Sequence, residues 1–221
     1  MRWTVPNVLT ILRLVAAPGL AVMFMVLIRP YADWGALILF VAAAVTDWFD
    51  GYLARAWHQQ TKLGAMLDPI ADKAMVMIAL LVIVGYSSLA TWLVIPATII
   101  LFREVFVSGL REYLGETTGT LKVKKLAKWK TTAQMVAIAV LFAHGIFEHY
   151  LDMVIWGMND ALVRDVFEGR VEDVTGVLVQ LRGMKVAGWI GLVILWIAAG
   201  LTLITGLNYA RKALQLVRET T

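Results

Sequence analysis

Apolar residues run along this chain in six long stretches that contain few charges, with polar segments between them. A helix needs about 20 apolar residues to cross the hydrocarbon core of a bilayer, and each stretch is close to that length. The pattern therefore predicts an all-α integral membrane fold with six transmembrane helices, over residues 8–29, 33–54, 69–88, 90–112, 131–151 and 187–209.

Composition supports this prediction. The 221 residues are 60% hydrophobic and 16% charged, whereas soluble domains carry about 25% charged residues. Few residues remain outside the stretches, so we expect a single transmembrane domain over residues 1–221. We expect no cleavable signal peptide, because the first stretch lacks a small-residue cleavage site and carries Arg13 within it. The chain has no cysteine, which excludes disulfides and thiolate catalysis.

Lysine and arginine gather in alternate segments between the stretches, and this distribution predicts the orientation of the chain. These residues are Arg2, Arg55, Lys62, Lys122, Lys124, Lys125, Lys128, Lys130, Arg211, Lys212 and Arg218. Because cytoplasmic loops of membrane proteins are enriched in lysine and arginine, both termini are expected in the cytoplasm. An even number of spans requires the same arrangement.

Residues 152–186 are predicted to form an extended extracytoplasmic loop. Apolar residues recur at helical spacing from Val171 to Leu181, which is compatible with a short amphipathic helix on the outer surface or with a passive spacer. His144 and His149 lie toward the same side of the membrane and are expected at its interface.

Four aspartates lie at the edges of two consecutive stretches. Asp47 and Asp50 are near the end of the second stretch, and Asp68 and Asp72 are near the start of the third. Spacings of three and four residues place each pair on one helix face. Because the connecting segment is short, the two helices are expected to pack as an antiparallel hairpin, with all four carboxylates converging at the cytoplasmic edge.

Such a cluster of acids requires cations, because like charges repel and a charge near the apolar region is costly. Divalent cations with oxygen ligands are the natural partners, and two of them would suit phosphoryl transfer. Gly51 and Gly64 would let a bulky ligand approach the backbone, and Arg55 could hold a phosphate. The alternative is that the aspartates are solvated or cap helices, as Asp68 before Pro69 suggests.

The spacing of these residues resembles a family signature, D-x-x-D-G-x-x-A-R-x8-G-x3-D-x3-D, which belongs to the CDP-alcohol phosphotransferases. Every position of the signature is matched, by Asp47, Asp50, Gly51, Ala54, Arg55, Gly64, Asp68 and Asp72. Three further stretches resemble the bacterial branch whose members make phosphatidylglycerol phosphate, at residues 6–13, 103–112 and 128–135. Ala127 departs from that branch, in which glycine is usual.

The resemblance implies a metal-dependent transferase with six transmembrane helices, usually a homodimer, in the bacterial cytoplasmic membrane. It implies that Asp47, Asp50, Asp68 and Asp72 bind two Mg²⁺ or Mn²⁺ ions and that Asp72 is the catalytic general base. CDP-diacylglycerol would be bound by Asp47, Gly51, Ala54, Arg55 and Gly64, and membrane lipids would surround the protein. No nucleic-acid partner is expected. In the implied reaction the acceptor hydroxyl attacks the lipid-side phosphorus and expels CMP.

Glycerol 3-phosphate is the expected acceptor, and its dianionic phosphate needs fixed positive charge. Arg103 and Arg111 lie near one face of the fourth predicted helix, and Lys128 and Lys130 lead into the fifth on the same side. We predict that these four residues bind the phosphate. For the two lysines the alternative is the general cytoplasmic bias or contact with anionic lipid.

Asn7, Thr10 and Arg13 form a polar stripe on the first predicted helix. Such a stripe is expected to face the interior of the bundle, where it would support the metal or nucleotide site or serve helix packing.

Other functions are compatible with parts of this pattern. Within the family the acceptor could be serine, inositol phosphate or a phosphatidyl lipid such as phosphatidylglycerol. A cation transporter also uses intramembrane carboxylates, but for that function we would expect acids near the middle of the bilayer and two repeated halves of the chain. A non-catalytic lipid-binding relative is the third alternative.

Overall fold

The computed structural model describes residues 4–56, 61–114 and 125–219. Within these ranges the chain is helical and contains no strand, which confirms the all-α class. The helices are α1 (Val5–Val26), α2 (Tyr31–Ala56), α3 (Lys62–Tyr86), α4 (Ala90–Leu114), α5 (Lys125–Trp156), α6 (Asp160–Phe167) and α7 (Val177–Glu219).

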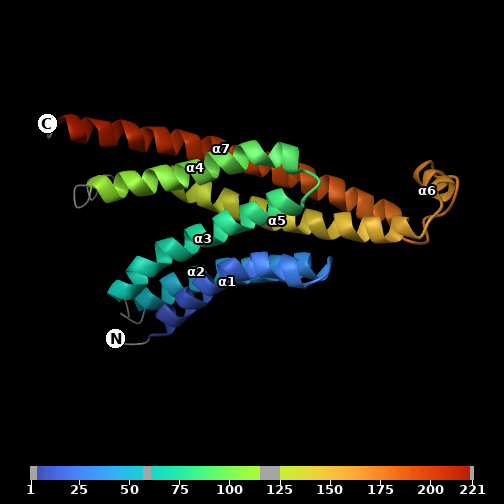
Figure 1. Cartoon of the computed structure of the whole chain (residues 1–221), viewed down its shortest axis with the longest axis horizontal. Helices are drawn as coiled ribbons and strands as arrows, with labels where there is room; N and C mark the ends of the chain where they lie inside the picture. The colour runs from blue at the N-terminus through green and yellow to red at the C-terminus, as the bar shows by residue number, and fades with distance from the viewer. Residues whose placement is uncertain (1–3, 57–60, 115–124, 220–221) are drawn as a thin grey trace.

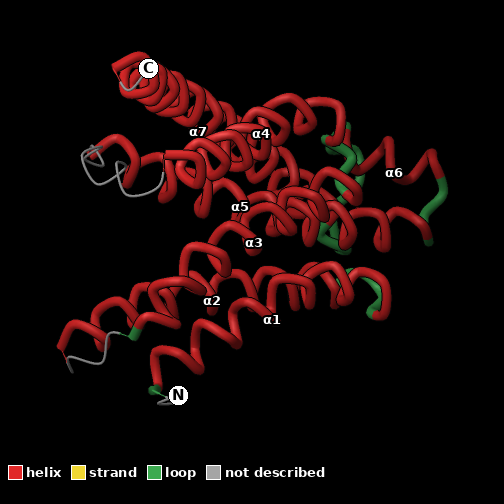
Figure 2. The backbone as a smooth tube through the Cα atoms, turned by 60° about the vertical axis from the view of Figure 1, so that its left-hand side comes forward, coloured by secondary structure: helices red, strands yellow, loops and turns green. Residues whose placement is uncertain are grey.

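The six long helices run roughly along one axis of an elongated bundle (Figure 1). Both chain termini lie at one end of the bundle, and α6 lies at the other end with the turns that join α1 to α2 and α3 to α4. Helices α5 and α7 pack along each other, and α4 packs on α7. Figure 2 shows α1, α2 and α3 as a second group beside these helices.

Four helices of the described part are long and apolar enough to cross a membrane, over Asn7–Val26, Ala90–Tyr113, Trp129–Trp156 and Val177–Arg218. The chain is therefore a multi-pass membrane protein. Helices α2 and α3 lie beside these segments and contain 26 and 25 residues.

The core of the bundle is built from small residues as well as large ones. Apolar contact between helices gains little in a bilayer, since lipid tails are equally apolar, so close backbone approach matters more. Alanines are buried on all six long helices, including Ala17, Ala36, Ala79, Ala97, Ala137 and Ala199. Larger side chains fill the space between them, among them Leu20, Phe40, Leu80, Ile100, Phe142 and Leu195.

The prediction that the second and third helices pack against each other as a hairpin is wrong. Helix α1 packs against both α2 and α3, and in the described residues these two helices have little direct contact with each other. The polar stripe of α1 is buried, with exposed fractions of 3%, 1% and 4% for Asn7, Thr10 and Arg13, so the prediction that it faces the interior is confirmed. These polar side chains explain the arrangement, because they need partners on the neighbouring helices.

Helix α3 begins earlier than the hydrophobic stretch indicated. The Thr61 side chain caps it by accepting a hydrogen bond of 3.0 Å from the Gly64 N–H group. Asp68 and Pro69 therefore lie within the helix, and the interpretation of Asp68 as a helix cap is wrong. Because Thr61 supplies the cap, the Asp68 carboxylate is available for contacts with α1.

The segment 152–186 is more ordered than a loop. Helix α5 continues to Trp156, α7 begins at Val177, and α6 lies between them. The possible helix over 171–181 is wrong, since residues 171–176 are not helical. The Asp173 carboxylate accepts hydrogen bonds from the Val177 and Leu178 N–H groups, at 2.9 and 2.8 Å, and so begins α7 before the hydrophobic stretch.

The early start of α7 also changes the environment of His144. This residue was expected at the interface, but it is only 3% exposed because α7 covers it. Its Nδ1 atom donates a hydrogen bond of 2.9 Å to the Met184 carbonyl.

Candidate active site

Three of the four predicted carboxylates gather around one arginine. Arg13 of α1 donates from Nη1 to Asp47 Oδ1 of α2, at 2.5 Å, and to Asp72 Oδ1 of α3, at 2.7 Å. Its Nη2 lies 3.5 Å from Asp68 Oδ1. Arg13 is buried, whereas the three aspartate side chains are 42–49% exposed. We call this arrangement of Arg13, Asp47, Asp68 and Asp72 the acidic recess.

The rest of the polar stripe fixes the start of α3. Thr10 Oγ1 donates a hydrogen bond of 2.6 Å to Asp68 Oδ1, and Asn7 Oδ1 accepts one of 2.7 Å from Thr61 Oγ1. A Cβ atom added to Gly64 would lie 2.9 Å from Asn7 Oδ1. A larger residue at position 64 would therefore require the Asn7 side chain to move.

Five predicted residues cannot be assigned contacts. Asp50, Gly51, Ala54 and Arg55 lie in the last turns of α2, and Lys128 lies in the first turn of α5. Their side chains are outside the described part of the structure, so the contribution of the fourth carboxylate stays a prediction.

The donor chemistry of the acidic recess fits a divalent cation. Carboxylate oxygens are the ligands that Mg²⁺ and Mn²⁺ prefer, and three carboxylates against one guanidinium leave excess negative charge. Among the described side chains, however, no group of three or more acids or histidines is disposed as the ligands of one metal ion. The three carboxylates are arranged around Arg13, which supplies the positive charge at their centre in this structure.

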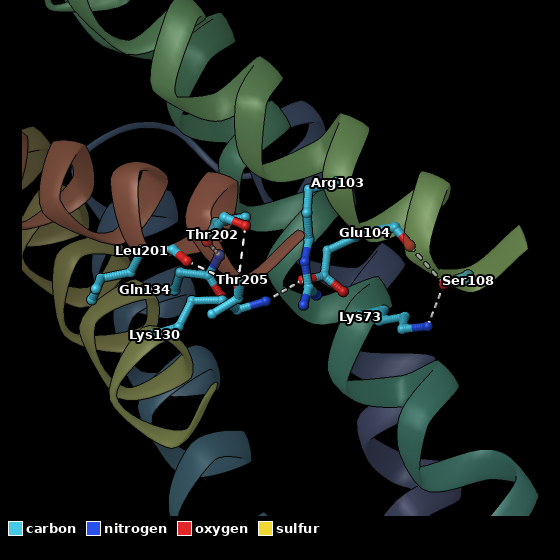
Figure 3. A network of polar contacts seen from close by, with 9 residues as sticks. All are labelled: Lys73, Arg103, Glu104, Ser108, Lys130, Gln134, Leu201, Thr202 and Thr205. Atoms are coloured by element: carbon cyan, nitrogen blue, oxygen red, sulfur yellow. Dashed lines mark hydrogen bonds and ion pairs between the residues drawn. The ribbon is translucent and has the colours of Figure 1, made fainter. Parts of the chain in front are cut away.

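A second cluster lies on α4 and α5 and joins three charged side chains (Figure 3). Arg103 Nη1 donates a hydrogen bond of 2.9 Å to Glu104 Oε1, and Lys130 Nζ donates to the same oxygen. The three side chains are only 15%, 13% and 6% exposed. Two cations share one carboxylate, so this basic cluster carries a net positive charge inside the bundle.

Helix α7 supports the basic cluster. A Cβ atom added to Gly206 would lie 2.8 Å from Arg103 Cγ, so the glycine makes room for the arginine side chain. The Arg103 Nε atom is buried and has no hydrogen-bond partner in the described part of the chain. The guanidinium of Arg111, one of the four predicted phosphate-binding residues, lies over the Tyr209 ring of α7, at 5.5 Å from the centroid.

Two consecutive hydrogen bonds connect α3, which carries Asp68 and Asp72 of the acidic recess, with α4, which carries Arg103 and Glu104 of the basic cluster. Lys73 of α3, next to Asp72, donates from Nζ to Ser108 Oγ of α4 at 2.6 Å, and Ser108 Oγ donates to the Glu104 carbonyl at 2.6 Å (Figure 3). Lys73, Glu104, Gly206 and Tyr209 are not among the site residues predicted from the sequence. Glu104 could have been found, because an acid between buried cations is needed to offset their charge.

Comparison with known proteins agrees with the signature. The sequence model of CDP-alcohol phosphatidyltransferases matches residues 3–163, and the chain belongs to this family. A relative from Cereibacter sphaeroides, a CDP-diacylglycerol–glycerol-3-phosphate 3-phosphatidyltransferase, is 57% identical over an alignment of 221 positions that covers 99% of each chain.

More distant relatives carry the same name. The proteins of that name from Shigella flexneri serotype 5b and Escherichia coli K12 are each 37% identical over 159 residues, which are 71% of this chain and 86% of theirs.

Proposed function

We propose that this chain transfers the phosphatidyl group of CDP-diacylglycerol to glycerol 3-phosphate, giving phosphatidylglycerol phosphate and CMP. The observation that carries the proposal is the pairing of the open acidic recess with the buried basic cluster, linked through Lys73 and Ser108. The acidic recess can hold a cation-bound diphosphate, and the basic cluster can hold an anionic acceptor. The relative that is 57% identical over the full chain supports the same reaction.

Asp47, Asp50, Asp68 and Asp72 would hold the divalent cations, Mg²⁺ or Mn²⁺. When bound, these cations neutralise charge on the phosphate oxygens and on the departing CMP. Arg13 and Thr10 orient the carboxylates through the hydrogen bonds described above. The donor nucleotide would lie against Asp47, Gly51, Ala54, Arg55 and Gly64, where the two glycines leave the backbone open.

Asp72 serves as the general base. It lies one helical turn further along α3 than Asp68, and its side chain is half-exposed. In the proposed step Asp72 accepts the proton of the acceptor hydroxyl, whose oxygen forms a bond to the lipid-side phosphorus. The bond between this phosphorus and the bridging oxygen breaks, and CMP leaves with that oxygen. A carboxylate within hydrogen-bond reach of the hydroxyl is sufficient for this role.

Arg103, Arg111, Lys128 and Lys130 bind the phosphate of the acceptor. The burial of Arg103 and Lys130 supports this assignment, because a desolvated cation attracts an anion more strongly than one in water. Their net positive charge favours a phosphorylated acceptor over serine, which carries no phosphate group. Glu104 holds the two cations close together until the phosphate enters.

All six long helices, α1 to α5 and α7, cross the membrane in the proposed arrangement, as one domain with both termini in the cytoplasm. At 1.5 Å per residue, α2 and α3 are each about 38 Å long, which exceeds a hydrocarbon core of about 30 Å. The position of both termini at one end of the bundle supports the orientation (Figure 1). The membrane is the bacterial cytoplasmic membrane, and the enzyme acts as a homodimer.

The direct test measures CMP release from CDP-diacylglycerol by the purified chain with Mg²⁺ or Mn²⁺. Glycerol 3-phosphate, serine and inositol phosphate are offered in parallel, and Asp72→Asn is the control. Release that depends on glycerol 3-phosphate and is lost in Asp72→Asn is expected. Release with a different acceptor would overturn the assignment of the basic cluster, and release that survives Asp72→Asn would overturn the role of Asp72.

A further inference from the structure

A large groove lies at the end of the bundle opposite the acidic recess. It has a volume of about 600 Å³ and is formed by Trp92 at the start of α4, His144 of α5 and the first half of α7. That volume is typical of sites for small molecules. No residue predicted to bind the donor, the acceptor or the metals lines it.

The dimensions of the groove match one leaflet of a bilayer. Along α7 its lining extends from Met184 to Ile197, a rise of about 20 Å. One leaflet contributes half of the hydrocarbon core, about 15 Å. Gly188 brings α7 against α5, because a Cβ atom there would lie 3.0 Å from His144 Nδ1. The groove can therefore accommodate an extended acyl chain.

The lysine and serine side chains of the groove are at its outer end. Lys185 and Ser88 lie there, and Leu192, Val193 and Ile197 line the deeper part. Trp92 and Trp189 are 66% and 73% exposed, and tryptophan side chains favour the level of the lipid headgroups. A cationic mouth above an apolar channel is complementary to an anionic phospholipid, because lysine near a membrane surface attracts lipid phosphate.

His144 adds a buried polar side chain to the lining of this groove. Its Nε2 atom has no hydrogen-bond partner in the described part of the structure, and the nearest acid, Glu148, is 3.7 Å away. A helix packing here would have to cover the exposed charge of Lys185. Its apolar face would gain little, since lipid tails already solvate such surfaces.

We infer that this groove binds one anionic phospholipid from the leaflet opposite the acidic recess. The lysine at position 185 contacts the phosphate, and one acyl chain lies along α7 between Trp92 and Val193. This lipid is separate from the donor, whose reacting phosphate is at the other end of the bundle. The inference does not depend on the proposed reaction.

The test places the full chain in lipid nanodiscs of phosphatidylglycerol or phosphatidylcholine that contain a trace of the same lipid with a photoreactive acyl chain. Cross-linked peptides are mapped by mass spectrometry. Phosphatidylglycerol should label α7 between residues 188 and 197 about fivefold more than phosphatidylcholine, the factor that corresponds to about 1 kcal/mol per lysine at an anionic surface. Asp72→Asn should leave this labelling unchanged.

Two pairs of variants make the test specific. Val193→Trp fills the groove and should abolish the labelling, whereas Ile204→Trp, also exposed on α7 but outside the groove, should preserve it. Lys185→Gln should remove the preference for phosphatidylglycerol, whereas Arg182→Gln, one turn earlier on the same helix, should not.

Equal labelling by the two lipids, or labelling that survives Val193→Trp, would overturn the inference. It would also be overturned if the groove were unlabelled and Val193→Trp converted a dimer into a monomer by light scattering. That result would assign the groove to an interface between two copies of the chain.

Discussion

At the scale of single residues, Arg13 has the most consequential position, because one buried guanidinium contacts carboxylates from two other helices. The sequence indicated that the aspartates converge and that the stripe of α1 is buried. It left open whether this stripe supports the metal or nucleotide site or serves helix packing, because the contacts of Arg13 join residues 34 to 59 positions apart.

Replacement of Arg13 by lysine should impair the acidic recess although the charge is kept. Lysine lacks the planar fork that lets arginine donate to several carboxylates at once. We expect the apparent affinity for Mg²⁺, or the turnover rate, to fall about 10- to 100-fold, as for residues that orient metal ligands. Arg29→Lys is the control, because Arg29 is also hydrogen-bonded to a carboxylate, that of Asp33, but at the other end of the bundle. Equal effects of the two substitutions would contradict a specific role for Arg13.

Arg103→Ala tests the basic cluster. Loss of this buried cation should raise the KM for glycerol 3-phosphate about 10-fold or more, with a smaller change in the KM for CDP-diacylglycerol. A hydrogen bond to a charged group contributes about 1.5–3 kcal/mol. Steady-state kinetics with each substrate varied in turn provide the measurement, and Lys212→Ala, an exposed change on α7, is the control. Parallel rises in both constants would argue against an acceptor-binding role.

At the scale of helices, each of the six hydrophobic stretches corresponds to one long helix of the described residues, and four of these helices are long and apolar enough to cross a membrane. The stretches over 33–54 and 90–112 agree with α2 and α4 within two residues at each end, but the stretches did not indicate where α3 and α7 begin or how the helices pack. Helices α3 and α7 begin before the apolar stretches, because the Thr61 and Asp173 side chains accept hydrogen bonds from the first backbone N–H groups. Hydropathy does not register such bonds. The hairpin was wrong because the signature residues of α2 and α3 are close in sequence, whereas their contacts are made through α1.

Gly64→Ala should disturb the contact between α1 and α3. The new methyl group would lie 2.9 Å from Asn7 Oδ1, and overpacking of this kind costs about 1–3 kcal/mol. A lower melting temperature in detergent and slower CMP release are expected. Gly85→Ala is the matched control, because this glycine lies on the same helix with no neighbouring atom within 4 Å. A Gly64 variant as stable as the Gly85 variant would contradict the close approach.

Asp173 should make the start of α7 sensitive to acid. Hydrogen bonds from the Leu178 and Val177 N–H groups hold the pKa of its carboxyl below the ordinary value, which is about 3.9. The carboxylate therefore stabilises the helix start above that value, and the contribution is lost as the pH falls through the lowered pKa. Hydrogen-exchange protection of residues 177–180 should decrease in this acidic range. Asp173→Asn should have lower protection at pH 7 and less dependence on pH.

At the scale of the whole molecule, the chain forms two groups of helices, and each carries part of the proposed chemistry. The acidic recess belongs to α1, α2 and α3, and the basic cluster belongs to α4 and α5 with α7 behind them. The family signature indicated which residues matter, but the division into two groups depends on packing between distant segments. No local pattern in the sequence encodes it.

The proposed orientation can be tested with single cysteines, because the natural chain has none. Cysteine at Glu168, after α6, should react with a membrane-impermeant maleimide added to intact cells. Cysteine at Arg218, near the end of α7, should react only after the cells are opened. The opposite pattern would reverse the assignment of both termini to the cytoplasm.

The hydrogen bond from Lys73 to Ser108 lies at the seam between these two groups of helices. In the proposed reaction one group would grip the donor and the other the acceptor, so the spacing across this seam sets the distance between hydroxyl oxygen and phosphorus. A misplacement of 1 Å can cost about 100-fold in rate. A rocking motion of one group against the other would therefore change the turnover rate while both substrates remain bound.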